Sequence, residues 1–350
     1  MDFTYTSLPG RVGFGRGLAA ERLREAVDEL GLTSVLLIAA EAESDLADRL
    51  TTGLRDRIAG VYSDVRPHVP SAVAEAARAK AAEVGADGLL SIGGGSTTGT
   101  AKIVALTTGL PIVAVPTTYA GSEMTPVWGL TTDARKETGI DRRVLPAAVV
   151  YDSELLSTLP RDLAVASGFN ALAHCVEAFW GPGANPVTSL HAAEGIRALA
   201  DGLRGLGSGS PTAEDEDRLL YGAYLAGGSF AVAGSGLHHK ICHALGGAYD
   251  LPHAQTHAVV LPHVLAFNAA AIGEDAAAMA RALRVDDAVD GLRELSTSLG
   301  VPADLAALGF PVDRFDEAVE IIAAKLPIAN PRPVAEADIR DILRGAVGVH

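Results

Sequence analysis

The segment GLLSIGGGSTTGTAK, residues 88–102, decides the fold of the first part of the chain. It runs from an apolar stretch through three glycines into a segment with helical spacing that opens with hydroxyl side chains. Such a passage brings free backbone N–H groups and the positive end of a helix dipole to one point, where a phosphate group can bind. It matches neither GxGxxG nor the GK[ST] of nucleotide-hydrolysing loops. The residues expected to contact a pyrophosphate are Gly93, Gly94, Gly95 and Ser96.

Apolar runs and amphipathic segments alternate over the first 150 residues. The pattern predicts strands at 34–40, 60–65, 87–94, 111–118 and 147–152. Helical spacing between strands is typical of a parallel sheet. After about residue 155 nearly every segment has helical spacing. We therefore expect an α/β nucleotide-binding domain over residues 1–155 and an all-helical domain over residues 156–350.

The composition narrows the classes of partner. The chain has 350 residues, 48% of them hydrophobic, and a formal net charge of -15 at pH 7. This charge argues against nucleic acid, since such binding depends on Lys and Arg at phosphates. No leader pattern and no apolar run long enough to span a membrane is visible, which predicts a cytoplasmic protein. Cys175 and Cys242 lie far apart and suit reduced thiols.

Two further features accompany the glycine segment. Glu41 follows the predicted strand 34–40, where a carboxylate can bind the adenosine ribose of NADH and repel the 2'-phosphate of NADPH. The alternative is an ordinary solvent-exposed acid. PTTYAGSEMTPVWG, residues 116–129, places hydroxyl groups directly after another strand. The cofactor-binding candidates in that segment are Thr117, Thr118 and Ser122.

Seven of the ten histidines fall in three short segments, SGFNALAHCVEAF at 167–179, HHKICH at 238–243 and PHAQTHAVVLPH at 252–263. Residues four apart lie on one face of a helix, so each of the first two segments is expected to present a pair of polar side chains together. Imidazole serves both metal binding and acid–base catalysis. The paired residues are Asn170 with His174 and His239 with His243, and the third segment adds His253, His257 and His263.

Together these motifs resemble the iron-containing (group III) alcohol dehydrogenases, which share a fold with dehydroquinate synthase. The resemblance rests on GGGS, on PTTYAGSE, on N-x3-H and on H-x3-H. It rests also on a Pro-His whose histidine, His253, lies fourteen residues after His239, the first histidine of H-x3-H. The resemblance extends to about residue 268. It implies a dehydroquinate synthase-like fold, a nicotinamide cofactor and a homodimer. In that family an Asp and three His hold the metal. The matching positions are Asn170, His174, His239 and His253.

Asn170 is a departure from that ligand set. A neutral amide is a weaker ligand than a carboxylate, and it leaves the site one unit more positive. A divalent ion can still bind three imidazoles, as catalytic zinc does. We therefore expect that no metal is required; if one is bound, its ligands are His174, His239 and His253.

Ala254 is a second departure, because iron alcohol dehydrogenases generally read PHGxxNA where this chain reads PHAQTHA. With SGFNALAHCVEAF, AGSEMTPVWGLT and RRVLPAAVVYD, the sequence is similar to the maleylacetate reductases. That subfamily forms 3-oxoadipate from the dicarboxylate maleylacetate during bacterial degradation of hydroxyquinol and related aromatic compounds. The resemblance implies reduction of a conjugated C=C bond by NADH or NADPH. The alternatives are an iron- or zinc-dependent alcohol dehydrogenase, a synthase or lyase of the same fold, and a non-catalytic nucleotide-binding protein.

Reduction of such a substrate requires a bound hydride donor, stabilisation of charge on the ketone oxygen and a source of protons. We predict that His243 donates the proton and that His174, His239 and His253 bind carboxylate or enolate oxygens. Lys136 occupies the place where members of the family contact the cofactor. The further substrate-binding candidates are Asn170, His257, Tyr119, Lys240 and Arg142, the last two being alternatively exposed surface charges.

Overall fold

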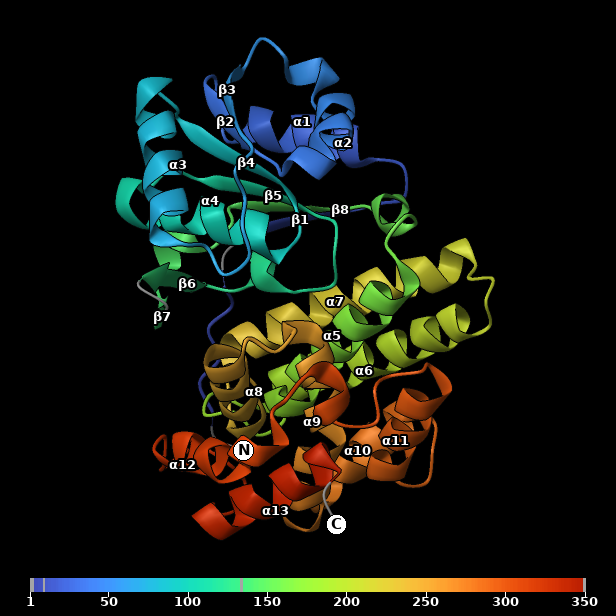
Figure 1. Cartoon of the computed structure of the whole chain (residues 1–350). Helices are drawn as coiled ribbons and strands as arrows, with labels where there is room; N and C mark the ends of the chain where they lie inside the picture. The colour runs from blue at the N-terminus through green and yellow to red at the C-terminus, as the bar shows by residue number, and fades with distance from the viewer. Residues whose placement is uncertain (1–2, 9, 133–134, 349–350) are drawn as a thin grey trace. The chain divides into compact units, whose positions relative to one another are not determined.

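The computed structural model describes residues 3–8, 10–132 and 135–348, with the side chains of residues 135 and 136 excluded, and the chain forms two compact units (Figure 1). One unit is Leu8–Leu159, and the other combines Met1–Ser7 with Pro160–His350. An α/β unit with a parallel sheet followed by an all-helical unit is the fold class that the sequence predicts.

The described part of the first unit is built on a six-stranded parallel sheet with the strand order β1-β8-β5-β4-β2-β3. The inner strands are completely buried, because helices cover both faces, and their sequences are correspondingly continuous apolar runs. The strands are β1 (Arg11–Phe14), β2 (Val35–Ile38), β3 (Ile58–Tyr62), β4 (Gly88–Gly93), β5 (Ile112–Pro116) and β8 (Ala148–Tyr151).

Four helices cover the two faces of this sheet (Figure 1). Helices α1 (Ala19–Glu29) and α2 (Ser44–Leu50) pack on one face, where Leu37 and Leu90 belong to their core. Helices α3 (Ser71–Glu83) and α4 (Gly95–Thr108) pack on the other face. Short 3-10 helices connect the elements: η1 (Glu41–Glu43), η2 (Thr52–Leu54), η3 (Ser122–Met124), η4 (Arg142–Val144) and η5 (Ser153–Leu156).

Three strands lie outside the sequence prediction. Strand β1 has only four residues and is half-exposed at the edge of the sheet, paired with β8. The strands β6 (Val127–Thr132) and β7 (Arg135–Ile140) form a separate antiparallel pair. β6 is only partly buried and β7 is mainly polar in sequence, so neither shows the continuous buried apolar run that identifies the inner strands.

The second unit consists of helices in all its described parts of regular structure. Helices α5, α6 and α7 pack against one another, and a second core joins α8, α9, α12 and α13. Across the described residues, no helix has both the length and the apolar run needed to span a membrane. The helices are α5 (Arg161–Ala178), α6 (Pro186–Gly207), α7 (Ala213–Ala233), α8 (Leu237–Tyr249), α9 (His253–Asn268), α10 (Gly273–Leu283), α11 (Ala288–Ser298), α12 (Phe315–Ala323) and α13 (Glu336–Val347), with short 3-10 helices η6 (Ala269–Ala271), η7 (Ala306–Leu308) and η8 (Val312–Arg314).

Gly93, at the end of β4, occupies a position that excludes a side chain. Its φ is 151°, and a Cβ there would collide with Oε2 of Glu43 and Oγ1 of Thr97. We predict that Gly93→Ala lowers the free energy of unfolding by about 1–3 kcal/mol through backbone strain, measured by urea denaturation. The control Gly53→Ala, whose Cβ would meet nothing within 4 Å, should change it by less than about 0.5 kcal/mol. Equal unfolding midpoints for the two variants would contradict the prediction.

Candidate functional site

Six histidine rings of the helical unit form one connected cluster. Helix α5 carries one of them, α8 carries three and α9 carries two. Ring centroids of neighbours in the cluster lie between 4.5 Å and 6.2 Å apart. We refer to this group as the histidine cluster: His174, His238, His239, His243, His253 and His257. The structure thus brings together all five of the histidines to which the sequence assigned a role.

The cluster is buried at one end and exposed at the other. His243 and His253 are exposed, while the other four rings are buried. Burial lowers the pKa of His174 and of His238 to about 3, and it lowers the pKa values of His239 and His257 well below their usual value. The four buried rings are therefore neutral at pH 7. His243 and His253 are therefore the rings of the cluster that are in direct contact with solvent.

Local sequence explains why the rings converge. His239 and His243 are four residues apart on α8, and His253 and His257 are four apart on α9, so each pair lies on one helix face. Helix α8 begins after Gly236, and α9 begins at His253 itself, after Pro252. Phe230 of α7 stacks on two of the buried rings, with centroid distances of 4.5 Å to His174 and 4.4 Å to His239.

Glu177 is a site residue that the sequence analysis missed. Its fully buried carboxylate lies 2.5 Å from Nδ1 of His239 and accepts hydrogen bonds from the backbone N–H groups of Gly236 (3.0 Å) and His238 (2.7 Å). Burial raises the pKa of Glu177 to about 7, and the backbone hydrogen bonds oppose that rise. A signal was present, since Glu177 follows Asn170 by seven residues and His174 by three, which places all three on one face of α5.

His238 also has a role that the sequence did not reveal. Its Nε2 lies 2.9 Å from Nδ1 of His257, so these two rings share a hydrogen bond. Cys242 lies one turn along α8, with Sγ 3.7 Å from Nε2 of His238. Burial raises the pKa of the Cys242 thiol well above its usual value. Cys242 is therefore a neutral packing residue and not an activated nucleophile.

The buried end of the cluster presents polar atoms with no partner in the described part of the chain. These atoms include Oδ1 of Asn170, Nδ1 of His174 and Nε2 of His239, which belong to the ligand positions implied by the resemblance. The ligand atoms of His238, His239 and His257 form a second group, all within 4.8 Å of one another. Both groups contain His239, and metals bind imidazole in its neutral form. These donors fit a divalent cation.

The α/β unit collects a different set of predicted residues at the carboxyl ends of β4 and β5. The backbone N–H of Thr117 donates to the carbonyl of Gly93 over 3.2 Å, and a Cβ on Gly94 would lie 3.1 Å from the Thr118 side chain. Helix α4 begins with Gly95, and Ser96 lies in its first turn. Its N-terminal N–H groups thus lie where nucleotides bind in open parallel sheets.

Glu43, and not Glu41, is the acidic side chain that reaches this glycine segment. Glu41 is exposed at the start of η1. Glu43 accepts a 2.7 Å hydrogen bond from Oγ1 of Thr117, and burial raises the pKa of Glu43. The two acids are separated by one residue, and the role predicted for Glu41 at a ribose stays a prediction.

The remaining predicted residues are distributed as follows. Tyr119 is buried in the α/β unit, and Arg142 is exposed in the same unit on η4. Lys240 is exposed on α8, next to His239. Lys136 lies on β7, and its side chain is outside the described residues.

Lys102 is a second residue that the sequence analysis passed over. Its Nζ is fully buried and donates to the backbone carbonyls of Ser122 (2.5 Å), Thr125 (2.7 Å) and Val127 (2.9 Å). Helix α4, which follows the glycine segment, is thereby tied to the loop that carries Ser122. Burial lowers the pKa of Lys102 to about 7, and the nearby Glu123 opposes that change.

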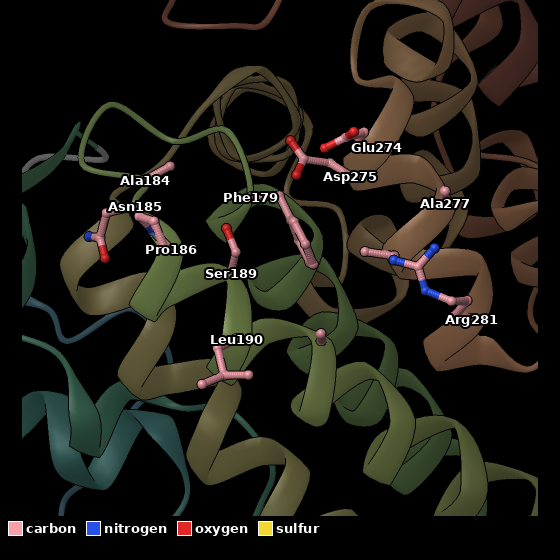
Figure 2. Close-up of a pocket in the computed structure, with 12 residues that line it drawn as sticks. Phe179, Ala184, Asn185, Pro186, Ser189, Leu190, Glu274, Asp275, Ala277 and Arg281 are labelled. Atoms are coloured by element: carbon pink, nitrogen blue, oxygen red, sulfur yellow. The ribbon is translucent and has the colours of Figure 1, made fainter. Parts of the chain in front are cut away.

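An open pocket of about 820 Å3 lies elsewhere in the helical unit (Figure 2). Residues at the start of α6 and on α10 line it, among them Asn185, Leu190, Asp275 and Arg281. None of its lining residues belongs to the histidine cluster. We therefore base the chemistry on the cluster and not on this pocket.

The chain is similar over nearly its whole length to known proteins. Residues 9–153 match the family profile "Iron-containing alcohol dehydrogenase", and residues 164–347 match "Fe-containing alcohol dehydrogenase family, C-terminal". A maleylacetate reductase from Burkholderia cepacia is 44% identical over 344 residues, which cover 98% of this chain and 97% of the relative. The similarity thus extends to α13, whereas the motifs that carry the resemblance end at about residue 268.

Solved structures agree with these relatives. The crystal structure of an iron-containing alcohol dehydrogenase from Corynebacterium glutamicum has a TM-score of 0.96 at 49% identity, covering 99% of this chain and 97% of that chain. A maleylacetate reductase from Rhizobium sp. strain MTP-10005 has a TM-score of 0.94 at 39% identity, covering 99% of this chain and 98% of that chain.

Lys102 makes the stability of the protein depend on pH. Its pKa is about 7 in the folded chain and returns toward 10.5 on unfolding, so between these values the unfolded chain binds the extra proton. Stability contributed by this group therefore rises with pH across that window. We predict that the free energy of unfolding of the wild type rises relative to that of Lys102→Met between pH 7 and 8.5, measured by urea denaturation.

Lys80→Met is the matched control, because Lys80 is a partly exposed lysine of α3 paired with Glu83. This variant should follow the pH dependence of the wild type. The prediction would be refuted if the difference in free energy of unfolding between the wild type and Lys102→Met stayed constant with pH.

Proposed function

The chain belongs to the iron-containing alcohol dehydrogenase family, and on that basis we propose that it reduces the conjugated C=C bond of maleylacetate to give 3-oxoadipate, with NADH or NADPH as the hydride donor. The full-length similarity to maleylacetate reductases supports this substrate. The structural observation that carries the proposal is the histidine cluster with a neutral amide, Asn170, on the helix face that carries His174. That arrangement offers a dianionic substrate many hydrogen-bonding groups, and no carboxylate at position 170 repels it.

The α/β unit has the groups that a dinucleotide requires. The N-terminus of α4 and the glycines Gly93–Gly95 are suited to a pyrophosphate, with hydroxyl groups of Thr117, Thr118 and Ser122 nearby in sequence and fold. Bound NAD(P)H supplies a hydride. Glu41, exposed at the start of η1, remains the proposed acid that accepts hydrogen bonds from a ribose and favours NADH over NADPH. Glu43 lies beside the glycine segment, where it accepts a hydrogen bond from Thr117.

The chemistry of the substrate defines what the cluster has to do. Hydride adds to the alkene carbon β to the ketone, the electron pair moves to the ketone oxygen, and a proton then completes the carbon between them. His243 is our candidate for the proton donor, because it belongs to the cluster and is exposed, so that solvent can return its proton. A bound dianion favours protonation of the imidazoles beside it.

The negatively charged groups of the substrate need donors. His174 and His253 are proposed to bind carboxylate or enolate oxygens, and the amide NH2 of Asn170 can donate to the same oxygens. Lys240, exposed on α8, is the proposed cation for a carboxylate, and Arg142 of the α/β unit is a second candidate. Tyr119 and His257 remain proposed contributors to substrate binding.

A metal ion is implied by the name of the family. The partnerless atoms of Asn170, His174 and His239, together with His253, would hold it. When bound, such an ion supplies positive charge beside the ketone oxygen. We propose that turnover does not depend on it, because the amide at position 170 provides no anionic ligand. The family resemblance further favours a cytoplasmic homodimer.

A second candidate function is favoured by the buried group His238, His239 and His257, whose ligand atoms all lie within 4.8 Å of one another. If an ion bound there or at the family position were essential, the protein would be a metal-dependent dehydrogenase of simple alcohols. Removal of metal by a chelator separates the two functions. Full activity on maleylacetate after this treatment favours our proposal, whereas loss of activity that iron or zinc restores favours the alternative.

The proposed function predicts that adding maleylacetate to the protein and NADH causes a fall in nicotinamide absorbance. No oxidation of NADH or NADPH would refute it. His243→Ala should lower the turnover number by at least about 100-fold, as expected for loss of a general acid, while NADH binding stays unchanged.

His191→Ala is the matched control, because it removes an imidazole that lies on α6, whereas the histidine cluster is carried by α5, α8 and α9. It should retain the turnover of the wild type. Equal turnover of His243→Ala and His191→Ala would remove His243 from its proposed role.

Asn170→Asp tests the electrostatic part of the proposal. The new carboxylate should increase affinity for zinc or iron by at least about tenfold, since it adds an anionic oxygen ligand. It should also raise KM for the dianionic substrate through repulsion. Metal content after equilibrium dialysis and steady-state kinetics measure the two effects. Unchanged metal affinity and unchanged KM would show that the charge at this position is irrelevant.

A further inference from the structure

We propose that Glu177 is a positioning residue for this site: it fixes the proton of His239 on Nδ1 and so presents an unprotonated Nε2 to whatever binds in the cluster. Glu177 lies on α5, whereas His239 lies on α8. The inference rests on the proposed function only for its kinetic test, since the location of a proton is measurable without any substrate.

The hydrogen bonds of the carboxylate decide which partner carries the proton. Oε1 accepts from the backbone N–H of His238 at 2.7 Å, and Oε2 accepts from the backbone N–H of Gly236 at 3.0 Å and of His239 at 3.4 Å. Backbone N–H groups can only donate, so these contacts favour the ionised carboxylate. The contact of 2.5 Å between Oε2 and Nδ1 of His239 then requires the proton on the ring.

Helix geometry adds to this preference. Gly236 is the N-cap residue of α8, and His238 and His239 lie in its first turn, where N–H groups have no partner within the helix and the dipole is positive. Glu177 therefore acts as a cap supplied from another helix. The same negative charge that stabilises the start of α8 also orients the ring of its third residue.

The ring of His239 is held in place from its faces as well. It stacks on Phe230 at a centroid distance of 4.4 Å and on His174 at 5.1 Å, with an angle of only 12° between the two imidazole planes. Nε2 is buried and has no hydrogen-bond partner among the described residues. A fixed ring plane and a fixed Nδ1 proton together define the direction of the lone pair on Nε2.

This assignment changes the role of His239. A neutral ring with its proton on Nδ1 accepts a hydrogen bond or binds a cation at Nε2, but it cannot donate to a carboxylate or an enolate. The role predicted from the sequence, binding an anionic oxygen, therefore falls to the other rings and to the Asn170 amide. A carboxylate that orients a histidine in this way is the arrangement found behind metal ligands and behind catalytic bases.

Substitution by glutamine is informative because Gln offers one acceptor oxygen and one NH2 group. If its oxygen faces His239, its NH2 confronts the N–H of His238. If its NH2 faces His239, Nδ1 must accept and the ring proton moves to Nε2. Glu177→Gln therefore shifts the tautomer of His239 or leaves a backbone donor unpaired.

The first experiment is 15N NMR of the full chain labelled at histidine, with the His239 signals assigned by their loss in His239→Gln. The wild type is expected to show a protonated Nδ1 and an unprotonated Nε2. Glu177→Gln is expected to populate the Nε2-protonated form, whereas Glu177→Asp should retain the wild-type form at least in part. A wild-type spectrum with the proton on Nε2 would overturn the proposal, and this result does not depend on any variant folding.

The second experiment is steady-state kinetics with NADH and maleylacetate. Glu177→Gln should lower kcat by about 10- to 100-fold with little change in the dissociation constant of NADH, as expected when the partner of an active-site histidine is lost. Glu177→Asp should recover part of kcat. Zinc affinity, followed by equilibrium dialysis, should fall in parallel, which provides a readout independent of turnover.

Glu194→Gln is the matched control, because it removes a carboxylate from the surface of the same unit, where Glu194 pairs with Arg197. It should leave the His239 spectrum, kcat and zinc affinity unchanged. A Glu177→Gln protein that keeps the wild-type His239 spectrum and kcat would reduce Glu177 to a helix cap and refute the proposal. If the wild type shows no turnover at all while its tautomer is as expected, the proposed substrate fails and the role of Glu177 stands.

Discussion

The carboxylate of Glu177 connects the two helices on which the candidate site depends most. It belongs to α5, the helix that also carries Asn170 and His174, and it binds the first N–H groups of α8, the helix that carries His239. One buried charge therefore fixes the relation between residues about 60 positions apart in the sequence. Loss of this contact would affect the start of α8, the orientation of the His239 ring and the stacking of His239 on His174 together.

Each unit uses a buried charge in the same physical way. In the α/β unit the ammonium group of Lys102 gathers the carbonyl groups of Ser122, Thr125 and Val127, and in the helical unit Glu177 gathers backbone N–H groups. Burying a charge is costly unless oriented dipoles replace the lost water. The backbone can supply them only in one conformation. The hydrogen bonds of these two buried groups thus favour a defined geometry in the segments that carry the candidate functional residues.

The sequence reveals features that depend on local spacing, and it hides features that depend on distant contacts. The inner strands could be predicted because two-sided burial makes them continuously apolar, and the histidine pairs because residues four apart share a helix face. Strands β1, β6 and β7 could not, since β1 has only four half-exposed residues and β6 and β7 lack a continuous buried apolar run. Glu177 and Lys102 acquire their roles only from partners on other elements, although the position of Glu177 on the Asn170 face of α5 was a usable sign. The helix period also could not predict that His239 is buried while His243, on the same helix face, is exposed.

The electrostatic effect of the neutral amide at position 170 depends on the charge state of the groups around it. The buried rings are uncharged at pH 7, and the carboxylate of Glu177 faces α8 and the Nδ1 side of His239. The atoms left for a ligand are therefore neutral donors and acceptors, and a dianion arriving there meets no carboxylate at position 170 to repel it. A negative charge favours the protonated form of an imidazole beside it, and His243 and His253 are the exposed rings of the cluster. In the proposed reaction, the substrate would thus help to bring in the proton that its reduction consumes, and an aspartate at position 170 would oppose its binding.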